Sequence, residues 1–220
     1  MPPCSHPFQT VPQKVTASET LDVDVLVVGM GGSGCAAAMS AAEASYAVDP
    51  EKVSVLAIDK AAKFGGTSAN CAEPMAVNAP RYKEAYNGGE DYMDGDLMKK
   101  NWLEYVDGGA KEEMLDLFLD NSGETVDWLH FDHGFVFNNP TTGFAETDIY
   151  RCKYQYTYLM NAEEGRDYGV ELKFRNEQVD EYFHNLIEDF EALGGEYMLE
   201  TEAYELLYDE SGNAITGVKA

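Results

Sequence analysis

Basic residues, cysteine and long apolar runs are all scarce in this chain of 220 residues. Lys and Arg number 15 against 40 Asp and Glu, which gives a formal net charge of −25. A surface of this charge repels nucleic-acid phosphates and anionic membranes, so we expect neither as a partner. No apolar stretch approaches the roughly 20 residues that span a bilayer. The four cysteines lack Cys-x-x-Cys or haem spacing, which favours a reducing, cytoplasmic compartment over a disulfide scaffold.

The first 20 residues also lack what a targeting segment needs. They contain four prolines but neither the apolar core of a secretory signal nor a twin arginine. We therefore expect residues 1–20 to be a flexible lead-in. The remaining residues, 21–220, are numerous enough to bury a sizeable core.

The most informative segment is the predicted strand at residues 22–28, apolar at Val23 and from Val25 to Val28, which breaks into three spaced glycines. Such a run suits a strand buried on both faces, as in a parallel sheet covered by helices. Gly29 allows the tight turn, Gly31 lets the backbone approach a pyrophosphate, and Gly34 permits close packing of helix on strand. The alanine-rich helix expected over 32–46 would point its free amide groups at the phosphates.

An acidic residue follows the second predicted strand. That strand is predicted from the apolar residues Val53, Val55, Leu56 and Ile58, and Asp59 comes directly after it. A carboxylate at this place can accept hydrogen bonds from ribose hydroxyls, although a solvated strand-end Asp is the alternative. The 25 residues from Gly34 to Asp59 slightly exceed the usual roughly 20.

Further motifs point to one family. After Asp59-Lys60 comes a second glycine pair with hydroxyls, Gly65-Gly66-Thr67-Ser68, and then Asn78-Ala79. Thr67 and Ser68 can donate to phosphate or ribityl oxygens. With these motifs the chain resembles the flavoprotein subunit family of fumarate reductase and succinate dehydrogenase, which includes 3-ketosteroid dehydrogenases and urocanate reductase-like enzymes. The resemblance continues through Trp128-Leu129 and covers most of residues 21–220.

The resemblance implies an α/β fold, a Rossmann-like FAD-binding domain with a parallel sheet, helices and a β-hairpin or meander layer. Residues 21–220 would be its N-terminal part, with a helical insertion at about 96–137 and without the cap domain and C-terminal FAD segment. It implies FAD bound non-covalently, because the histidine that some members attach to flavin is missing from 65–72. The implied cofactor contacts are Gly29, Gly31, Gly32, Ser33, Gly34, Asp59, Lys60, Gly65, Gly66, Thr67, Ser68, Asn78 and Ala203, the last through its backbone.

The sequence departs from the family pattern at two places. The family usually has Glu where Asp59 stands, so the reach is shorter and the charge is kept. The glycine pair expected before residues 75–79 is replaced by Glu73-Pro74.

The rest of the chain predicts a helical stretch and a small hairpin. Residues 96–131 have helical patterning, with Ser122 as a cap for the turn leading to Trp128. A helix over 177–193 ends at two glycines, and a strand at 196–201 and a C-terminal hairpin follow.

The resemblance implies hydride transfer through flavin N5 to or from a carbon–carbon bond activated by a carbonyl or carboxylate, in a small-molecule substrate. Its catalytic residues would lie outside this chain, so a second polypeptide could supply them with the cap. Two alternatives remain. One is a truncated or split nucleotide-binding fragment without catalysis, and the other is an NAD-dependent Rossmann dehydrogenase, which leaves Gly65–Ser68 unexplained.

Two other patterns are interpreted as structural. His130 and His133 are spaced as a metal pair on a helix would be, but no third ligand is in frame, so we predict no metal site. The alternating tyrosines from Tyr150 to Tyr158 are typical of a half-buried strand.

Overall fold

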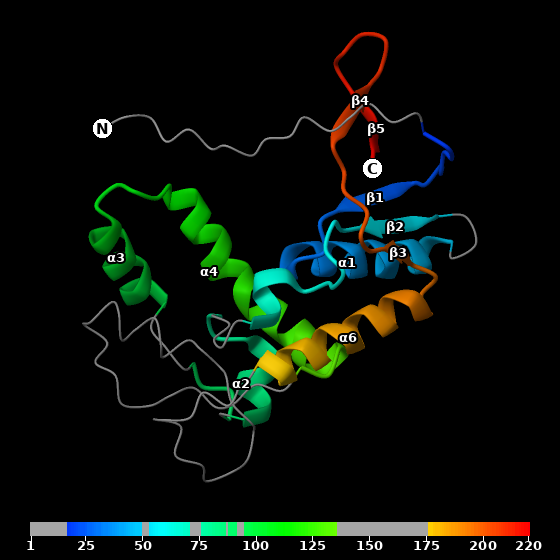
Figure 1. Cartoon of the computed structure of the whole chain (residues 1–220). Coiled ribbons are helices and arrows are strands. Elements are labelled where there is room, and N and C mark those ends of the chain that lie inside the picture. Colours follow the sequence, from blue (N-terminus) through cyan, green and yellow to red (C-terminus); the bar gives the residue numbers. More distant parts are fainter. Residues whose placement is uncertain (1–16, 50–52, 71–75, 87, 92–94, 136–175) are drawn as a thin grey trace. The chain divides into compact units, whose positions relative to one another are not determined.

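A computed structural model describes residues 17–49, 53–70, 76–86, 88–91, 95–135 and 176–220 (Figure 1). The alternating tyrosines, Cys71 and the Glu73-Pro74 pair lie outside these ranges, as does most of the expected lead-in. The chain divides into two compact units, residues 1–64 with 190–220 and residues 65–189. Each unit is described by itself.

The first unit contains a parallel sheet of three strands. They are β1 (Val25–Val28), β2 (Val55–Ile58) and β3 (Glu196–Met198), in the order β1-β2-β3. Val25 pairs with Val55, and Leu56 pairs with Glu196. The predicted parallel sheet is thus confirmed, with each strand shorter than the sequence pattern indicated.

The position of each strand in the sheet explains its burial. All four residues of the central strand β2 are buried. The sequence predicted that β1 is buried on both faces, but β1 lies at an edge of this sheet among the described residues. Its residues Val25, Leu26 and Val27 are half-buried, and Val28 is 53% exposed.

The start of the β1–β2 pair is held by a side-chain contact. The Asp24 carboxylate accepts hydrogen bonds from the amide of Ser54 at 2.8 Å and from its hydroxyl at 2.9 Å. These bonds lower the pKa of Asp24, because they stabilise its charged form.

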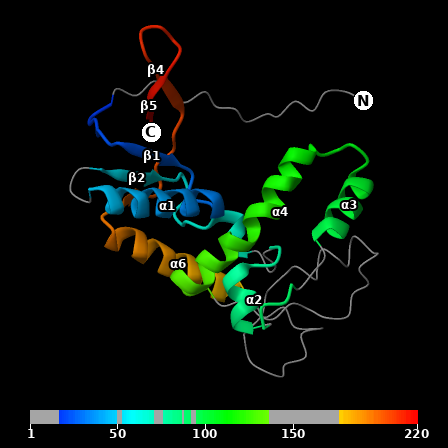
Figure 2. The same ribbon diagram turned by 180° about the vertical axis from the view of Figure 1, so that it is seen from behind.

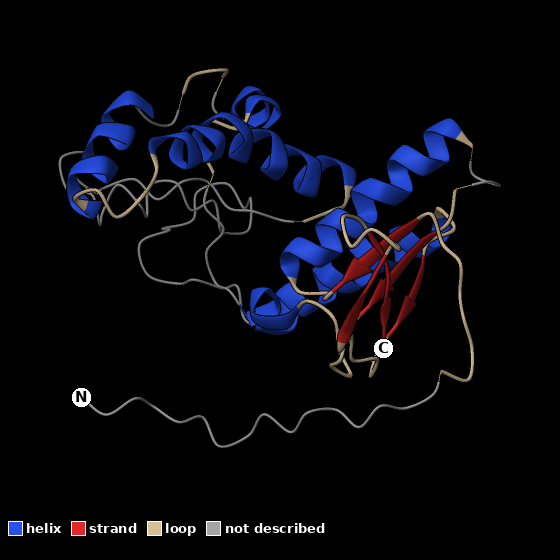
Figure 3. Ribbon diagram, turned by 90° about the horizontal axis from the view of Figure 1, so that it is seen from above, coloured by secondary structure: helices blue, strands red, loops and turns tan. Residues whose placement is uncertain are grey.

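Helix α1 (Gly32–Val48) packs on the sheet against β1 and β2 (Figures 1 and 2). Its buried residues recur at intervals of three and four, as expected for one face of a helix. They are Cys35, Ala38, Met39, Ala42 and Ser45. Most of them are small, which favours close packing of the helix on the strands. Figure 3 shows the strands in red with a helix beside them.

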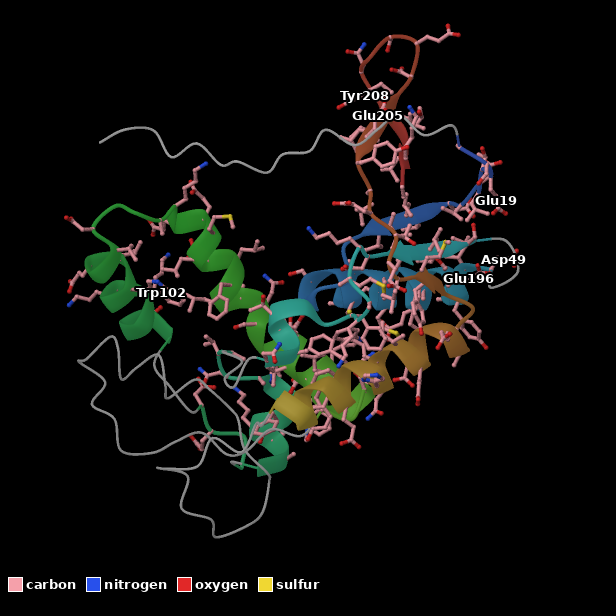
Figure 4. The ribbon with its side chains drawn as sticks, viewed as in Figure 1. Glu19, Asp49, Trp102, Glu196, Glu205 and Tyr208 are labelled. Carbon is pink, nitrogen blue, oxygen red and sulfur yellow. The ribbon has the colours of Figure 1, made fainter. Side chains whose placement is uncertain are left out.

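A hairpin of β4 (Glu205–Tyr208) and β5 (Ile215–Lys219) completes the first unit (Figure 4). Its turn is organised by Asp209, whose carboxylate accepts hydrogen bonds from the amide groups of Asn213 and Ala214 and from the Ser211 hydroxyl. The Ser211 bond is the main reason why the pKa of Asp209 lies below its usual value.

The second unit is helical. It contains a 3-10 turn η1 (Gly66–Asn70), helices α2 (Pro80–Tyr86), α3 (Gly95–Val106) and α4 (Glu112–Asp127), and a π-helical turn η2 (Trp128–Asp132). Helix α4 packs against α2 and α3. Between α3 and α4, Lys99 forms ion pairs with Glu112 and Asp116, and Trp102 packs edge-on against Phe118. Within the described ranges, no helix has the length and apolar character to cross a membrane.

Helix α6 (Asn176–Ala192) crosses the boundary between the two units in the sequence, and its last residues belong to the first unit. It ends just before the two glycines at 194 and 195, as the sequence predicted. The Gly195 amide donates to the Phe190 carbonyl at 3.0 Å, and the Gly194 amide donates to the Glu191 carbonyl at 2.9 Å. This pattern, with Gly194 at φ +86°, is a Schellman motif. The buried Phe190 ring lies so close to Gly195 that a Cβ there would come within 2.1 Å of it.

Gly195→Ala should therefore destabilise the chain by about 1–3 kcal/mol, because a methyl group has to displace the buried Phe190 ring. Gly217→Ala is the matched control, since its Cβ would have only an ordinary contact at 3.6 Å with Leu207. Urea unfolding should place the control within about 0.5 kcal/mol of the unchanged protein. Equal effects of the two substitutions would contradict this packing.

Candidate functional site

The glycine turn after β1 requires its first and third glycines for steric reasons. Gly29 has φ +96°, and its amide donates to the Ile58 carbonyl at 2.7 Å. A Cβ on Gly34 would lie 1.7 Å from the Gly29 carbonyl oxygen. Only glycine can stand at position 34 while the helix begins this close to the strand.

The second glycine of the turn faces open space. A Cβ on Gly31 would meet no atom within 4 Å. Gly31 is the N-cap of α1, no side chain caps this end of the helix, and the first turn contains no acidic residue. The first amide groups of a helix lack partners within it, and the helix dipole favours an anion there. The geometry therefore fits a phosphate group approaching Gly32, Ser33 and Gly34.

Asp59 connects this turn to the end of β2. One carboxylate oxygen, Oδ2, accepts a hydrogen bond from the Met30 amide at 2.5 Å. The other, Oδ1, accepts one from the Ala61 amide at 2.7 Å. A carboxylate has about four acceptor positions, so each oxygen retains one for a ligand hydroxyl. Lys60, next in the chain, is exposed. Sequence reasoning missed the bond to Met30, because no motif records a contact between residues 29 positions apart.

The segment after β3 runs beside Asp59. The Asp59 amide donates to the Met198 carbonyl at 3.0 Å, and the Thr201 amide donates to the Asp59 carbonyl at 2.8 Å. Between them, Glu200 adopts φ +53° and its amide donates to the Ala61 carbonyl at 2.9 Å. Just after Thr201 lies the half-buried Ala203. The first unit thus brings the glycine turn and Asp59 together. The segment that precedes Ala203 is bonded to Asp59 at the same ends of the strands.

The second glycine pair lies in the other unit. Gly65 has φ +85° and Gly66 has φ +51°, so both adopt a conformation that favours glycine. A Cβ on Gly65 would also lie 2.8 Å from the Ala69 Cβ. In the 3-10 turn that follows, Thr67 is exposed and Ser68 is half-buried, so the Thr67 hydroxyl is accessible to a ligand.

Asn78 is in the same unit and has φ +46°. Asn is among the few residues with a side chain that tolerate this conformation. The residues on either side of it contact α4. The prediction that Ser122 caps the turn before Trp128 is wrong, because Ser122 lies inside α4 and its hydroxyl oxygen accepts a hydrogen bond from the Val77 amide at 3.0 Å.

The two histidines near the π-helical turn have structural partners. His133 is buried, its Nδ1 lies 2.8 Å from an Asp189 carboxylate oxygen, and its ring packs edge-on against Trp128. His130 Nδ1 lies 2.5 Å from the Phe135 carbonyl oxygen. In the part of the chain that the structure describes, no group of three or more His, Cys, Asp or Glu side chains is arranged to hold a metal ion.

A shallow hollow in the second unit is lined by Pro80, Arg81, Glu84, Ala85 and Phe131. The Arg81 guanidinium forms two hydrogen bonds with Asp132, at 2.8 and 3.0 Å, and lies over the Phe131 ring at 4.5 Å from its centroid. The pairing lowers the pKa of Asp132. Because this guanidinium is already paired, we do not assign the hollow to the predicted site.

Two curated proteins are similar to the chain in sequence. It is 27% identical over 201 residues to urocanate reductase of Eggerthella lenta, covering 91% of this chain and 28% of that protein. It is 29% identical over 119 residues to NADH:fumarate oxidoreductase of Klebsiella pneumoniae, covering 54% of this chain and 12% of that protein. The chain thus spans less than a third of either relative.

Two solved structures share the fold. A 3-ketosteroid-Δ4-(5α)-dehydrogenase of Rhodococcus jostii superposes with a TM-score of 0.62 at 20% identity, over 92% of this chain and 43% of that one. An open conformation of a flavocytochrome c3 fumarate reductase gives 0.62 at 18% identity, over 89% of this chain and 29% of that one.

The family defined by an FAD binding domain matches residues 24–220, which include the glycine turn, Asp59 and the C-terminal hairpin. The predicted α/β flavoprotein fold and the predicted cofactor are confirmed. The chain belongs to this FAD binding domain family, and its cofactor is FAD.

Proposed function

We propose that this chain holds FAD in an oxidoreductase of the fumarate reductase type, which acts on a carbon–carbon bond activated by a carbonyl or carboxylate. The observation that carries the proposal is the glycine turn bonded to Asp59, with the uncapped end of α1 and open space at Gly31. FAD supplies hydride transfer through its flavin ring when bound. The names of the two sequence relatives support the reaction type.

The contacts in the first glycine turn and at Asp59 each have a physical task in this proposal. The amide groups at Gly32, Ser33 and Gly34 bind the pyrophosphate, since backbone donors at a helix start suit an anion. The remaining acceptor positions of Asp59 bind the ribose hydroxyls. Further contacts come from Lys60, Gly65, Gly66, Thr67, Ser68, Asn78 and the backbone of Ala203.

The partners in this proposal are a small-molecule substrate and a second polypeptide that supplies the cap and the C-terminal FAD segment, with the catalytic residues. The proposed location is the cytoplasm. The outer edge of β1 supports the second partner. Among the described strands none pairs with this edge, and Val28 is exposed beside it. An unpaired edge offers main-chain donors and acceptors to an added strand. The other reading is a nucleotide-binding fragment without catalysis of its own.

Gly31→Ala and Gly34→Ala should separate binding from folding. A methyl group added at position 31 would project into open space, so the FAD-free chain should lose at most about 1 kcal/mol of stability, the cost of alanine in place of glycine at an N-cap. Its FAD affinity should fall at least about tenfold. A methyl group added at position 34 would collide with the Gly29 carbonyl, so Gly34→Ala should lower stability even without FAD. If Gly31→Ala leaves FAD affinity unchanged, the phosphate does not bind at Gly31.

The purified chain should take up FAD and show a flavin absorbance band near about 450 nm. Acid precipitation should release the colour into the supernatant, because the binding is non-covalent. Colour that stays with the precipitate would contradict non-covalent binding. Uptake of NAD without any flavin would contradict the proposed function.

The FAD-loaded chain alone should not oxidise a reduced viologen dye with fumarate or urocanate faster than free FAD does. The reason is that the proposal places the catalytic residues outside residues 1–220. Turnover well above the free-FAD rate would overturn that placement and assign catalysis to this chain.

A further inference from the structure

Side chains in the second half of α4 hold the backbone on both sides of Asn78. The Ser122 hydroxyl accepts the hydrogen bond of the Val77 amide at 3.0 Å, on the N-terminal side of Asn78. Five residues later, at the end of α4, Asp127 accepts two amide hydrogen bonds, from Arg81 at 2.6 Å and from Tyr82 at 2.8 Å. Because both contacts join residues more than 40 positions apart, they fix the segment in space and not only its local shape.

The Asp127 side chain caps the N-terminus of another helix, α2. Helix α2 begins at Pro80, so the amides of Arg81 and Tyr82 belong to its first turn and have no partner within the helix. Ala79, at the place where a capping side chain would normally stand, has no polar group. Asp127 is the last residue of α4 and is only 4% exposed. Its carboxylate caps α2 in place of the missing side-chain cap at position 79.

Gly123 makes the approach of the two segments possible. A Cβ at this position would lie 2.5 Å from the Val77 carbonyl oxygen, 3.0 Å from the Ala79 Cα and 3.1 Å from the Ala79 nitrogen. All three atoms belong to the backbone, so no flexible side chain could move aside. Glycine is unfavourable inside a helix. Its place in α4 is explained by this contact.

We propose that Ser122, Gly123 and Asp127 are positioning residues that set the backbone of the Asn78 turn for FAD. This inference rests on the proposed function, in which Asn78 contacts the cofactor. Asn78 has a left-handed backbone, and the residues on both sides of it are bonded to or in close contact with α4. A shift of α4 against this segment would therefore move the Asn78 turn with it.

The decisive variant is Gly123→Ala in the full chain. Alanine has a higher helix propensity than glycine. If Gly123 matters only within α4, the variant should therefore be as stable as the unchanged protein or more stable. A positioning role predicts that the methyl group pushes residues 77–79 away and weakens FAD binding at least about tenfold, with a changed circular dichroism of the bound flavin. Glu124→Ala introduces the same residue on the exposed side of the same turn and should leave both readouts unchanged.

Two further variants test the hydrogen bonds without FAD. Ser122→Ala should speed the hydrogen exchange of the Val77 amide about tenfold or more, and Asp127→Asn should do the same for Arg81 or Tyr82, because an Asn offers one acceptor oxygen in place of two. Asp120→Asn makes the same charge change on an exposed position of α4 and is the control.

The outcomes separate this inference from the proposed function. If the unchanged chain binds no FAD, the proposed function fails and this inference fails with it. If the unchanged chain binds FAD and Gly123→Ala binds it equally well, only the positioning role is overturned. Loss of amide protection throughout the chain in Ser122→Ala and Gly123→Ala would show a role in folding alone and would also overturn it.

Discussion

The hydrogen bond between the Asp59 carboxylate and the Met30 amide is the interaction on which the candidate site depends. It joins the end of β2 to the glycine turn after β1, while the backbone bond from Gly29 to Ile58 holds the start of the turn. The same carboxylate orders the start of the next segment through Ala61. The short side chain of Asp59 suits a contact to the main chain of the turn.

Two separate devices therefore shape the predicted cofactor contacts. In the first unit, the C-terminal ends of β1 and β2 present main-chain amides and one carboxylate. In the second unit, α4 holds the backbone on both sides of Asn78 through the Ser122 hydroxyl and the Asp127 carboxylate, and Gly123 allows the close approach. Both devices use buried or half-buried polar groups that bond to backbone amides, which is where an unmade hydrogen bond is most costly.

The sequence predicted well what depends on local pattern and poorly what depends on tertiary contact. The glycine turn, the small-residue helix and the paired glycines after α6 each have short-range steric causes, so residues such as Gly34 and Gly194 could be assigned directly. Ser122 was misassigned as a local cap, because its partner Val77 is 45 residues away. The burial of β1 was overestimated for the same reason. An apolar run indicates a strand that can be buried on both sides, but the number of strands beside it comes from the rest of the domain.

The exposed edge of β1 also bears on how copies of this chain behave toward one another. No described strand pairs with the outer edge of β1, and an edge of this kind with an exposed valine is a template on which a second copy can add a strand and start aggregation. The net charge of −25 opposes that encounter, since two such chains repel one another at long range. Salt shortens this repulsion to about 8 Å at physiological ionic strength. The acidic composition thus opposes association through the outer edge of β1. The range of this repulsion depends on the ionic strength of the medium.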